Sequence, residues 1–410
     1  MPFPLIRNKG IDMNNEVIFA AAGNGKTYSI CKKAKEAIQI SNKYVLLISY
    51  TNEGIKSLER EYRKQNNGIL DDRITILSWY SFLLSELIHP YQSLVKFSTN
   101  NIEEYLPENF VKSIAFYERD SYRRPHYKYT DKRYFFNHNN DIRKDYVSNL
   151  ANQCNEHSQG KSIRRLEKIY SHIFIDEIQD YAGYDLEIIK LLFYSSINIL
   201  CVGDHKQSTF CTNNSQKNKQ YRNEDIYTYF TNLSKKSLLR ITFSNTTRRF
   251  NQEICYFVNT IHNDPNTAVI PSHDYPQILN SDHTGVYLIE EKYLSLYCKY
   301  YEPVILRYNK TSKINFDYGN CKILTYGSSK GTTHKRSLII PVSTVLPFLE
   351  RQVNDLEKNT RAKFYVACTR AMYSIVFAVK KLKINNVFKP ETIDIQGNLI
   401  QVLKFKKNET

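Results

Sequence analysis

The sequence predicts an α/β protein whose parallel sheets are flanked by helices. Short apolar runs alternate with helix-like segments along the chain, which is the pattern of parallel sheets. The runs are apolar nearly throughout, as strands buried on both faces must be. We predict strands at Glu16–Ala20, Tyr44–Ser49, His172–Ile175, Asn198–Val202, Val304–Arg307, Ser337–Pro341 and Ser374–Val379. We predict helices at Lys26–Ile40, Tyr184–Phe193, Asn251–Ile261 and Pro347–Lys358.

The composition is that of a folded protein with a basic surface. The 410 residues include 41% hydrophobic and 24% charged side chains, which excludes wholesale disorder. A net charge of +16 suits a phosphate backbone. It also suits a merely soluble basic surface, and charge alone leaves both interpretations open.

The cysteines and the apolar runs indicate a cytoplasmic protein without membrane contact. The eight cysteines form no CxxC pair and no Cys/His cluster with zinc spacing. Several lie inside apolar runs, as free thiols in a reducing compartment do. No run approaches the roughly 18 apolar residues of a membrane span, and the first residues do not resemble a secretion signal.

A strand, a glycine-containing loop and a helix follow one another near the start of the chain. Glycines let successive backbone N–H groups point at phosphate oxygens, and a helix N-terminus adds positive charge there. The pattern predicts that Lys26 reaches the β- and γ-phosphates and that the Thr27 hydroxyl binds Mg²⁺. The strict pattern has Gly at Ala20, so a turn without a ligand is the alternative. The predicted nucleotide contacts are Ala22, Gly23, Asn24, Gly25, Lys26 and Thr27.

A second apolar strand ends in two carboxylates, Asp176 and Glu177. Strand ends form the ligand crevice of α/β sheets, so both acids would face the nucleotide. Asp176 would hold Mg²⁺ and Glu177 would polarise the attacking water. Burying an acidic pair without a cation is costly. The loop and the acid pair together therefore predict hydrolysis of a nucleoside triphosphate.

From Asp176 to Asp180 the sequence resembles the UvrD/Rep family of superfamily 1A DNA helicases, and other motifs of that family recur in order. The first motif of the family also has Ala at the position of Ala20. The segments that resemble family motifs are Ala20–Thr27, Ser49–Asn52, Asp176–Asp180, Val202–Ser208, Thr247–Arg249, Ser329–Gly331 and Tyr365–Ala371.

The resemblance implies two RecA-like domains of P-loop NTPase type that clamp ATP and Mg²⁺ between them. The first would supply the loop, Asp176, Glu177 and Gln207, which would sense the γ-phosphate. The second would supply Arg249 and the arginine finger Arg370, with Gly331 of the fifth motif also at the nucleotide. Closing the domains would complete the site and couple hydrolysis to motion.

The same resemblance suggests domain boundaries. We predict the first part of RecA-like domain 1A at 1–86, an inserted helical subdomain 1B at 87–165, the second part of 1A at 166–237 and RecA-like domain 2A at 238–410. Residues 87–165 show no clear strand pattern. The stretch between Asn259 and Tyr301 is too short for the family's usual 2B insert. Lys404–Thr410 is a polar tail that we expect to fray.

The resemblance also implies a path for single-stranded DNA. Tyr50, Thr51 and Asn52 belong to a motif that lines this path, and Phe210 remains from an aromatic stretch that stacks bases. Trp79 and Tyr80 occupy another strand-contacting motif. These two rings could stack bases or pack the domain core.

The chain departs from the family at three places. Met1–Asn15 contains no Gln where the family has an adenine-recognition Gln, which leaves the choice of nucleotide open. Gly327 and Thr333 replace the His and Glu of the fifth motif, and Cys211–Asn214 replaces further aromatic residues.

The inserted segment is basic and aromatic, as nucleic-acid surfaces and protein interfaces both are. Aspartates dilute its charge, and both interpretations stay open. The basic residues are Arg119, Arg123, Arg124, Lys128, Lys132, Arg133, Arg143 and Lys144, and the interleaved rings are Tyr122, Tyr127, Tyr129 and Tyr134.

The predicted function is an ATP-driven 3′-to-5′ translocase or helicase acting on single-stranded or partly duplex DNA. The alternative is a DNA- and nucleotide-sensing subunit that activates a partner nuclease without processive unwinding. Small UvrD-like chains of this kind resemble the helicase subunit of the Gabija anti-phage system, which works beside an OLD-type nuclease. This resemblance implies a protein partner of that type and a role in defence or repair.

Overall fold

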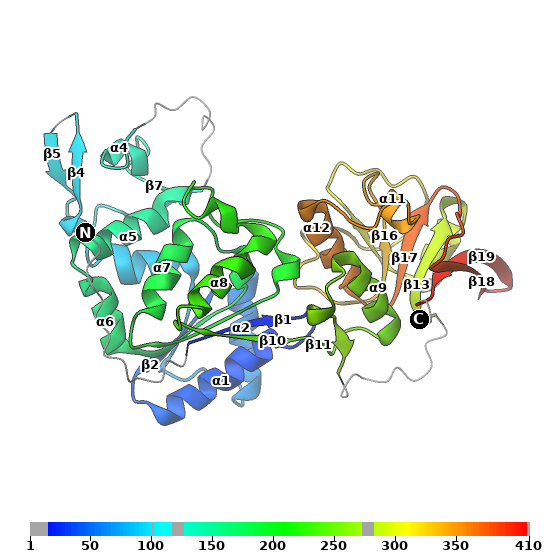
Figure 1. Ribbon diagram of the computed structural model, residues 1–410, viewed down its shortest axis with the longest axis horizontal. Helices are drawn as coiled ribbons and strands as arrows, with labels where there is room; N and C mark the ends of the chain where they lie inside the picture. The colour runs from blue at the N-terminus through cyan, green and yellow to red at the C-terminus, as the bar shows by residue number, and fades with distance from the viewer. Residues whose placement is uncertain (1–14, 101, 117–126, 273–282, 408–410) are drawn as a thin grey trace. The chain divides into compact units, whose positions relative to one another are not determined.

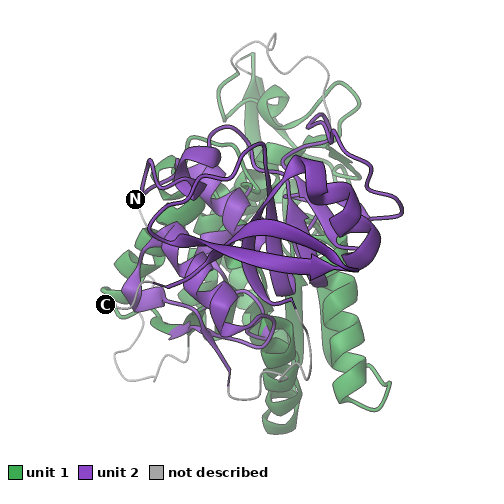
Figure 2. Cartoon of the chain, turned by 90° about the vertical axis from the view of Figure 1, so that its right-hand side faces the viewer, with its two compact units in different colours: residues 1–19, 26–203, 210–242 green, residues 20–25, 204–209, 243–410 purple. Residues whose placement is uncertain are grey.

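The computed structural model describes residues 15–100, 102–116, 127–272 and 283–407, and the chain divides into two compact units (Figure 2). Unit 1 comprises residues 1–19, 26–203 and 210–242. Unit 2 comprises residues 20–25, 204–209 and 243–410. Each unit holds one large sheet with helices packed on it (Figure 1). The predicted α/β class with parallel sheets is confirmed.

The sheet of unit 1 has six strands in the order β10-β1-β9-β8-β2-β3. The strands β1, β9, β8, β2 and β3 pair in parallel. Alternate residues of one strand enter different cores: Val45 and Leu47 pack on one face, and Leu46 and Ile48 on the other. Both faces are therefore covered, which explains why the strands are continuous apolar runs. The strands are β1 (Glu16–Ala20), β2 (Tyr44–Ser49), β3 (Ile74–Ser78), β8 (Tyr170–Ile175), β9 (Asn198–Gly203) and β10 (Arg240–Ser244), and the main helices are α1 (Lys26–Ile40), α2 (Asn52–Gln65), α7 (Tyr184–Phe193) and α8 (Ile226–Ser234).

The segment predicted as a helical insert contains helices and also two small sheets. β4 pairs with β5 antiparallel and β6 pairs with β7 in parallel. These strands are two to four residues long, too short for a period-two pattern to emerge from the sequence. Before this segment lie α3 (Trp79–Phe82) and a π-helical turn (Leu83–Ile88), which ends just inside it. The elements that follow are β4 (Lys96–Thr99), β5 (Ile102–Tyr105), β6 (Ile114–Ala115), α4 (Lys132–Phe135), β7 (Ile142–Arg143), α5 (Val147–His157) and α6 (Lys161–Ile169), the last of which extends beyond the predicted end at residue 165.

The sheet of unit 2 has seven strands in the order β15-β14-β16-β17-β13-β19-β18. The first five pair in parallel, and β19 runs antiparallel to both β13 and β18. The strands are β13 (Gly285–Glu290), β14 (Val304–Arg307), β15 (Ile323–Thr325), β16 (His334–Ile339), β17 (Ala371–Val379), β18 (Phe388–Ile395) and β19 (Asn398–Phe405). The helices are α9 (Gln252–His262), α10 (Leu294–Tyr301), α11 (Leu346–Leu349) and α12 (Lys358–Cys368), and β11 (Thr246–Thr247) pairs with β12 (Ile270–Pro271).

All seven predicted strands are present, although β8, β16 and β17 begin two or three residues earlier than predicted and β16 ends at Ile339 rather than Pro341. The helix predicted at Pro347–Lys358 is wrong. α11 ends at Leu349, and the carboxylate of Glu357 accepts hydrogen bonds from the backbone N–H groups of Asn359 and Thr360, which starts α12 there instead. The start of α12 is therefore determined by the side-chain cap of Glu357, and the apolar pattern did not reveal it.

The polar tail predicted from Lys404 onward is wrong for its first two residues, because β19 continues to Phe405. Phe405 is buried beside Phe388, with ring centroids 5.7 Å apart. β18 and β19 turn at Gln396 and Gly397, whose φ angles of 53° and 83° suit a tight hairpin. This hairpin was absent from the predicted strands.

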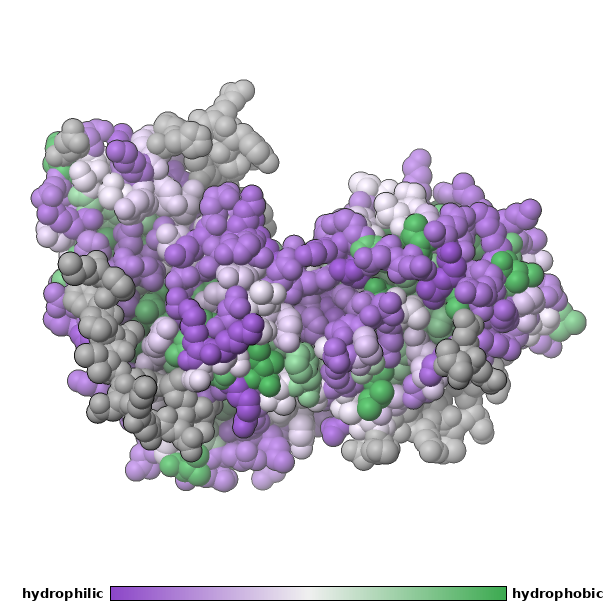
Figure 3. All heavy atoms as spheres, viewed as in Figure 1, coloured by the Kyte–Doolittle hydropathy of each residue, from purple (hydrophilic) through white to green (hydrophobic). Residues whose placement is uncertain are grey.

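Two further properties concern the whole described chain. All eight cysteines are free thiols, as the sequence predicted. Among the helices of the described residues, none is both long and apolar enough to cross a membrane. The face shown in Figure 3 is mostly hydrophilic, with scattered hydrophobic side chains.

Candidate nucleotide and nucleic-acid sites

The carboxyl edge of the unit 1 sheet brings together the predicted phosphate and metal residues of that unit. α1 begins at Lys26, just after the loop that follows β1, and Asp176 follows β8 directly. Parallel strands end at the same edge, so the start of α1 and Asp176 lie on the ligand side of the sheet. Asp176 is buried, and its backbone N–H donates to the Ile48 carbonyl at 2.9 Å.

Glu177 occupies a strained backbone conformation. Its φ of 54° lies in the left-handed region, which a residue with a β-carbon adopts at a cost of order 1 kcal/mol. A 3₁₀ turn over Ile178–Asp180 holds it there, since the Asp180 N–H donates to the Glu177 carbonyl at 3.0 Å. The side-chain amide of Gln179 donates to the Glu177 carboxylate. This turn, which we call the carboxylate turn (residues 176–180), fixes where the candidate base lies.

Residues 20–25 of the phosphate loop belong to unit 2, and their carbonyl groups accept hydrogen bonds from other residues of that unit. The Thr247 hydroxyl donates to the Ala22 carbonyl at 2.8 Å, and the Arg248 N–H donates to the Gly23 carbonyl at 2.9 Å. Gly23 has a φ of 75°, and an added β-carbon would lie 2.5 Å from the β-carbon of Arg249. Only glycine fits this position. The Asn24 amide donates to the Thr246 carbonyl at 2.8 Å, so its side chain anchors the loop.

The residue types of this region fit a magnesium nucleotide. The Thr27 hydroxyl and the Asp176 carboxylate are the hard oxygen ligands that Mg²⁺ prefers. Gly23 and Gly25, at φ angles of 75° and 90°, give the turn in which backbone N–H groups can face an anion. Lys26 lies in the first turn of α1, where the helix N-terminus adds partial positive charge.

Gln207 and Arg370, both predicted to contact the γ-phosphate, meet in unit 2. The Arg370 guanidinium donates to Gln207 Oε1 at 3.0 Å, and the Gln207 amide donates to Asp204 Oδ2 at 2.9 Å. Arg370 is 1% exposed and also donates to the Val366 carbonyl at 2.8 Å. Arg249 donates to the carbonyl of the residue preceding Arg370, at 3.0 Å. The geometry therefore brings Gln207, which the family resemblance assigned to the first domain, together with the two arginines that it assigned to the second, and all three lie in unit 2.

His334 is a residue of this group that the sequence did not indicate. The backbone N–H of His334 donates to the Arg370 carbonyl at 2.9 Å. The ring Nε2 of His334 lies 2.8 Å from the Thr332 hydroxyl. Burial lowers the pKa of His334, and the charges of Lys322, Arg370 and Arg249 lower it further. The one feature of the sequence near His334 is the preceding Thr333, which stands where the fifth motif of the family has Glu.

Gly331, predicted at the nucleotide, lies in an exposed turn of unit 2. Its φ is 83°, and an added β-carbon would meet no atom within 4 Å. Glycine is therefore required here by backbone conformation rather than by close approach of a neighbouring group.

Four aromatic side chains of unit 1 form a cluster that we call the aromatic platform: Tyr50, Tyr80, Phe116 and Phe210. Ring centroids lie 5.5 Å apart for Tyr50 and Tyr80, 5.4 Å for Tyr50 and Phe210, and 5.6 Å for Tyr80 and Phe116. Phe116 and Phe210 are 54% and 36% exposed. Three of the four were predicted to contact DNA. Phe116 was missed because it lies among the many aromatic residues of the insert, outside any motif.

Thr51 and Asn52 lie at the start of α2, directly after Tyr50. Both are exposed, and the Thr51 hydroxyl caps the helix by accepting from the Gly54 N–H at 3.0 Å. A helix N-terminus beside exposed rings suits the phosphate of a nucleic acid whose bases stack on those rings.

The prediction that Trp79 stacks on DNA bases is wrong, and the core alternative holds. Trp79 is 0% exposed, its Nε1–H donates to Asp185 Oδ1 at 2.7 Å, and its ring packs edge-on against Tyr181 at 4.9 Å. Trp79 and Tyr80 are consecutive in a helical turn, so their side chains point in different directions. Tyr80 reaches the aromatic platform while Trp79 enters the core.

The basic residues of the insert make internal contacts. Arg133 forms a salt bridge with Asp131 at 2.7 Å and lies over the Tyr127 ring at 4.5 Å. The Arg133 guanidinium holds the pKa of the Asp131 carboxyl below its ordinary value. Lys132 pairs with Glu104 at 3.4 Å. Of the cluster named from the sequence, Arg119, Tyr122, Arg123 and Arg124 lie outside the described residues.

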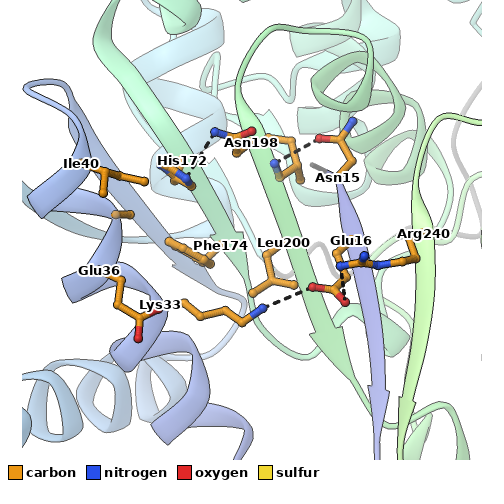
Figure 4. A pocket seen from close by; sticks show the side chains of 12 residues that line it. Asn15, Glu16, Lys33, Glu36, Ile40, His172, Phe174, Asn198, Leu200 and Arg240 are labelled. Carbon is orange, nitrogen blue, oxygen red and sulfur yellow. Dashed lines mark hydrogen bonds and ion pairs between the residues drawn. The ribbon is translucent and has the colours of Figure 1, made fainter. Parts of the chain in front are cut away.

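A pocket of about 590 Å³ lies at the other end of the unit 1 sheet (Figure 4). Its lining includes Glu16 and Asn198, the first residues of β1 and β9, and His172, the third residue of β8. It is therefore at the amino edge, away from the carboxylate turn. Three of its charged side chains pair with one another, since Glu16 bonds to Lys33 at 3.2 Å and to Arg240 at 3.4 Å.

Comparison with known proteins identifies the type of domain. Residues 58–228 match the family model of the UvrD/REP helicase N-terminal domain. No curated protein matches the chain. Two solved structures of arterivirus nonstructural protein 10, described as a helicase, are similar over 89% of this chain: one alone (11% identity, TM-score 0.44) and one with DNA (10% identity, TM-score 0.41). The chain spans 59% and 60% of the length of those proteins.

Proposed function

We propose that this chain, whose residues 58–228 match the family model of the UvrD/REP helicase N-terminal domain, is an ATP hydrolase of the UvrD-like type that moves along single-stranded DNA. One observation carries the proposal: Lys26, Thr27, Asp176 and Glu177 all follow strands of one parallel sheet at its carboxyl edge. That edge is where such sheets bind ligands. The 3′-to-5′ direction of movement is part of the proposal and rests on the family resemblance alone.

Each residue of the proposed site has a role that its chemistry supports. Lys26 and the loop N–H groups hold the phosphates, and Thr27 and Asp176 hold Mg²⁺, which when bound neutralises phosphate charge. Glu177 orients and polarises a water molecule for attack on the γ-phosphorus. Gln207, Arg249 and Arg370 supply hydrogen bonds to the charge that develops on the transferred group. The strained turn at Glu177 holds its carboxylate in one place before the nucleotide arrives.

The aromatic platform supports single-stranded DNA as the polymer. Stacking of a base on an aromatic side chain contributes about 1–3 kcal/mol and tolerates any sequence. Tyr50, Tyr80, Phe116 and Phe210 form a cluster of mutually tilted rings, of which Phe116 and Phe210 are exposed to a base. Exposed Thr51 and Asn52 at the start of α2 add a positive helix end for a phosphate. A net charge of +16 favours the approach of DNA.

A second candidate function is a DNA- and nucleotide-sensing subunit that activates a partner nuclease, of OLD type by the Gabija resemblance. The short stretch between α9 and β13, residues 263–284, favours it, because the regulatory insert of full-length relatives would not fit in this length. Such a chain would hydrolyse ATP on DNA yet separate strands poorly without its partner.

The test compares ATP hydrolysis with and without a single-stranded oligonucleotide for wild type, Lys26→Ala and Glu177→Gln. We expect DNA to stimulate wild type, Glu177→Gln to bind nucleotide but hydrolyse at least a hundredfold more slowly, and Lys26→Ala to bind nucleotide poorly. Lys32→Ala, an exposed lysine on the same helix, is the matched control. Unchanged nucleotide binding and hydrolysis in Lys26→Ala would sink the proposal. Strand displacement by the pure chain separates the motor from the sensor.

A further inference from the structure

Asp185, in the first turn of α7, is a buried carboxylate that no sequence motif singled out. It is 2% exposed and accepts three side-chain hydrogen bonds. Trp79 Nε1–H donates to its Oδ1 at 2.7 Å, the Ser148 hydroxyl donates to the same oxygen, and the Thr212 hydroxyl donates to its Oδ2 at 2.5 Å. We call Trp79, Ser148, Asp185 and Thr212 the Asp185 network.

Both carboxylate oxygens of Asp185 accept hydrogen bonds, but burying the charge costs free energy. Burial raises the pKa of the Asp185 carboxyl, and the hydrogen bonds from Ser148, Thr212 and Trp79 lower it. A buried carboxylate persists only where donors of this kind compensate its lost hydration. An apolar residue of similar volume would fill the space without the free-energy cost of removing a carboxylate from water. Stability alone therefore does not account for a carboxylate at this position.

The three donors come from segments far apart in sequence, and two of them adjoin the aromatic platform. Trp79 precedes Tyr80, and Thr212 follows Phe210 by two residues. The ring of Tyr181 contacts both Trp79 of the network and Tyr50 of the aromatic platform, with centroid distances of 4.9 Å and 6.3 Å. One carboxylate therefore fixes the backbone on two sides of the platform.

The network also reaches the carboxylate turn. The Thr212 hydroxyl accepts from the Ala182 N–H at 3.0 Å, and the Thr212 N–H donates to the Asp180 carbonyl at 2.9 Å. The Asp180 N–H in turn donates to the Glu177 carbonyl at 3.0 Å. Two consecutive hydrogen bonds therefore connect the segment that carries Phe210 to Glu177, the residue in the left-handed conformation.

We propose that Asp185 is a positioning residue through which DNA on the aromatic platform adjusts Glu177, so that stimulation of ATP hydrolysis by DNA depends on the Asp185 network. This inference rests on the proposed function. It adds to that function the route by which occupancy of one ligand site changes the other, through a contiguous set of hydrogen bonds with identified members.

The experiment measures basal hydrolysis, DNA-stimulated hydrolysis and DNA affinity for Asp185→Asn and Thr212→Val in the full chain. Asparagine keeps the size of the side chain but presents an amide to the donors. We expect basal hydrolysis within about twofold of wild type and at least a tenfold loss of the DNA-stimulated increment, with DNA still bound. Tyr229→Phe is the matched control, because the Tyr229 hydroxyl donates to the Leu186 carbonyl of the same helix at 2.8 Å.

A spectroscopic readout separates this inference from its premise. Trp79 is the only tryptophan of the chain, so its fluorescence reports the network directly. Saturating oligothymidylate should shift the emission of wild type and of Tyr229→Phe, and the shift should be lost in both network variants. Full DNA stimulation in Asp185→Asn and Thr212→Val, or equal losses of basal and stimulated rates, would overturn the inference. If wild type shows no stimulation by DNA, the proposed function itself fails.

Discussion

Replacing Phe210 by alanine removes one ring of the aromatic platform with a modest effect on folding. The side chain is 36% exposed, and its ring centroid lies 5.4 Å from that of Tyr50. Because about two thirds of the side chain is buried, the lost apolar burial should lower the free energy of unfolding by about 1–2 kcal/mol. Loss of one stacked base should cost about 1–3 kcal/mol of DNA binding, a roughly 5- to 150-fold increase in Kd.

The assay is fluorescence anisotropy with a labelled single-stranded oligonucleotide at fixed salt, because affinity for a phosphate backbone changes steeply with salt. Tyr44→Ala is the matched control. Tyr44 is 47% exposed at the amino end of β2, whereas Tyr50 of the platform follows the carboxyl end of that strand. Urea unfolding of both variants checks that the fold survives. If Phe210→Ala and Tyr44→Ala both bind DNA within twofold of wild type, the platform is not the DNA-binding surface.

Two further predictions concern unit 2. Arg370→Ala should lower kcat for ATP by about 10³-fold or more with DNA affinity unchanged, whereas Arg361→Ala on the preceding helix should not; equal kcat values in both variants would remove Arg370 from the reaction. Burial lowers the pKa of His262 to about 2 and that of His283 to about 3, against about 6.5 in the unfolded chain. Between about pH 3 and pH 6.5 these histidines bind protons only in the unfolded state. The free energy of unfolding should therefore fall as pH decreases below about 6.5. Each histidine should cost roughly 1.4 kcal/mol at pH 5.5. Urea unfolding at pH 7.5 and 5.5 measures this loss, and His283→Asn should reduce it; an unchanged pH dependence in that variant would contradict the assignment.

The strands could be predicted because their physics is local. A strand with both faces covered needs apolar side chains at every position, as in Tyr44–Ser49, where Leu46 and Leu47 enter different cores. The β18–β19 hairpin alternates apolar and polar residues and carries Pro390, so its pattern falls between those of a strand and a loop. The boundary of α12 depended on a cap by Glu357, which an apolar periodicity cannot reveal.

The site could be predicted where a motif is continuous in sequence, as at Lys26 or Asp176. It could not be predicted where tertiary contacts decide the role of a side chain. Trp79 and Tyr80 are consecutive aromatic residues, yet Trp79 bonds to the buried Asp185 carboxylate and packs against Tyr181, whereas Tyr80 contacts Tyr50 of the aromatic platform. The positions of Asp185, His334 and Phe116 depend on contacts with residues remote in sequence.

The hairpin that ends the unit 2 sheet has a consequence for association between chains. Among the residues that the structure describes, β18 is the last strand of the sheet, and a strand edge without a neighbour invites a strand of another molecule to add to it. Pro390 offers no N–H at this edge, and the side chains of Lys389 and Asp394 are exposed along it. A second copy would have to forgo a ladder hydrogen bond and accommodate these charges. The same eight residues that complete the sheet therefore discourage its growth into a polymer at high protein concentration.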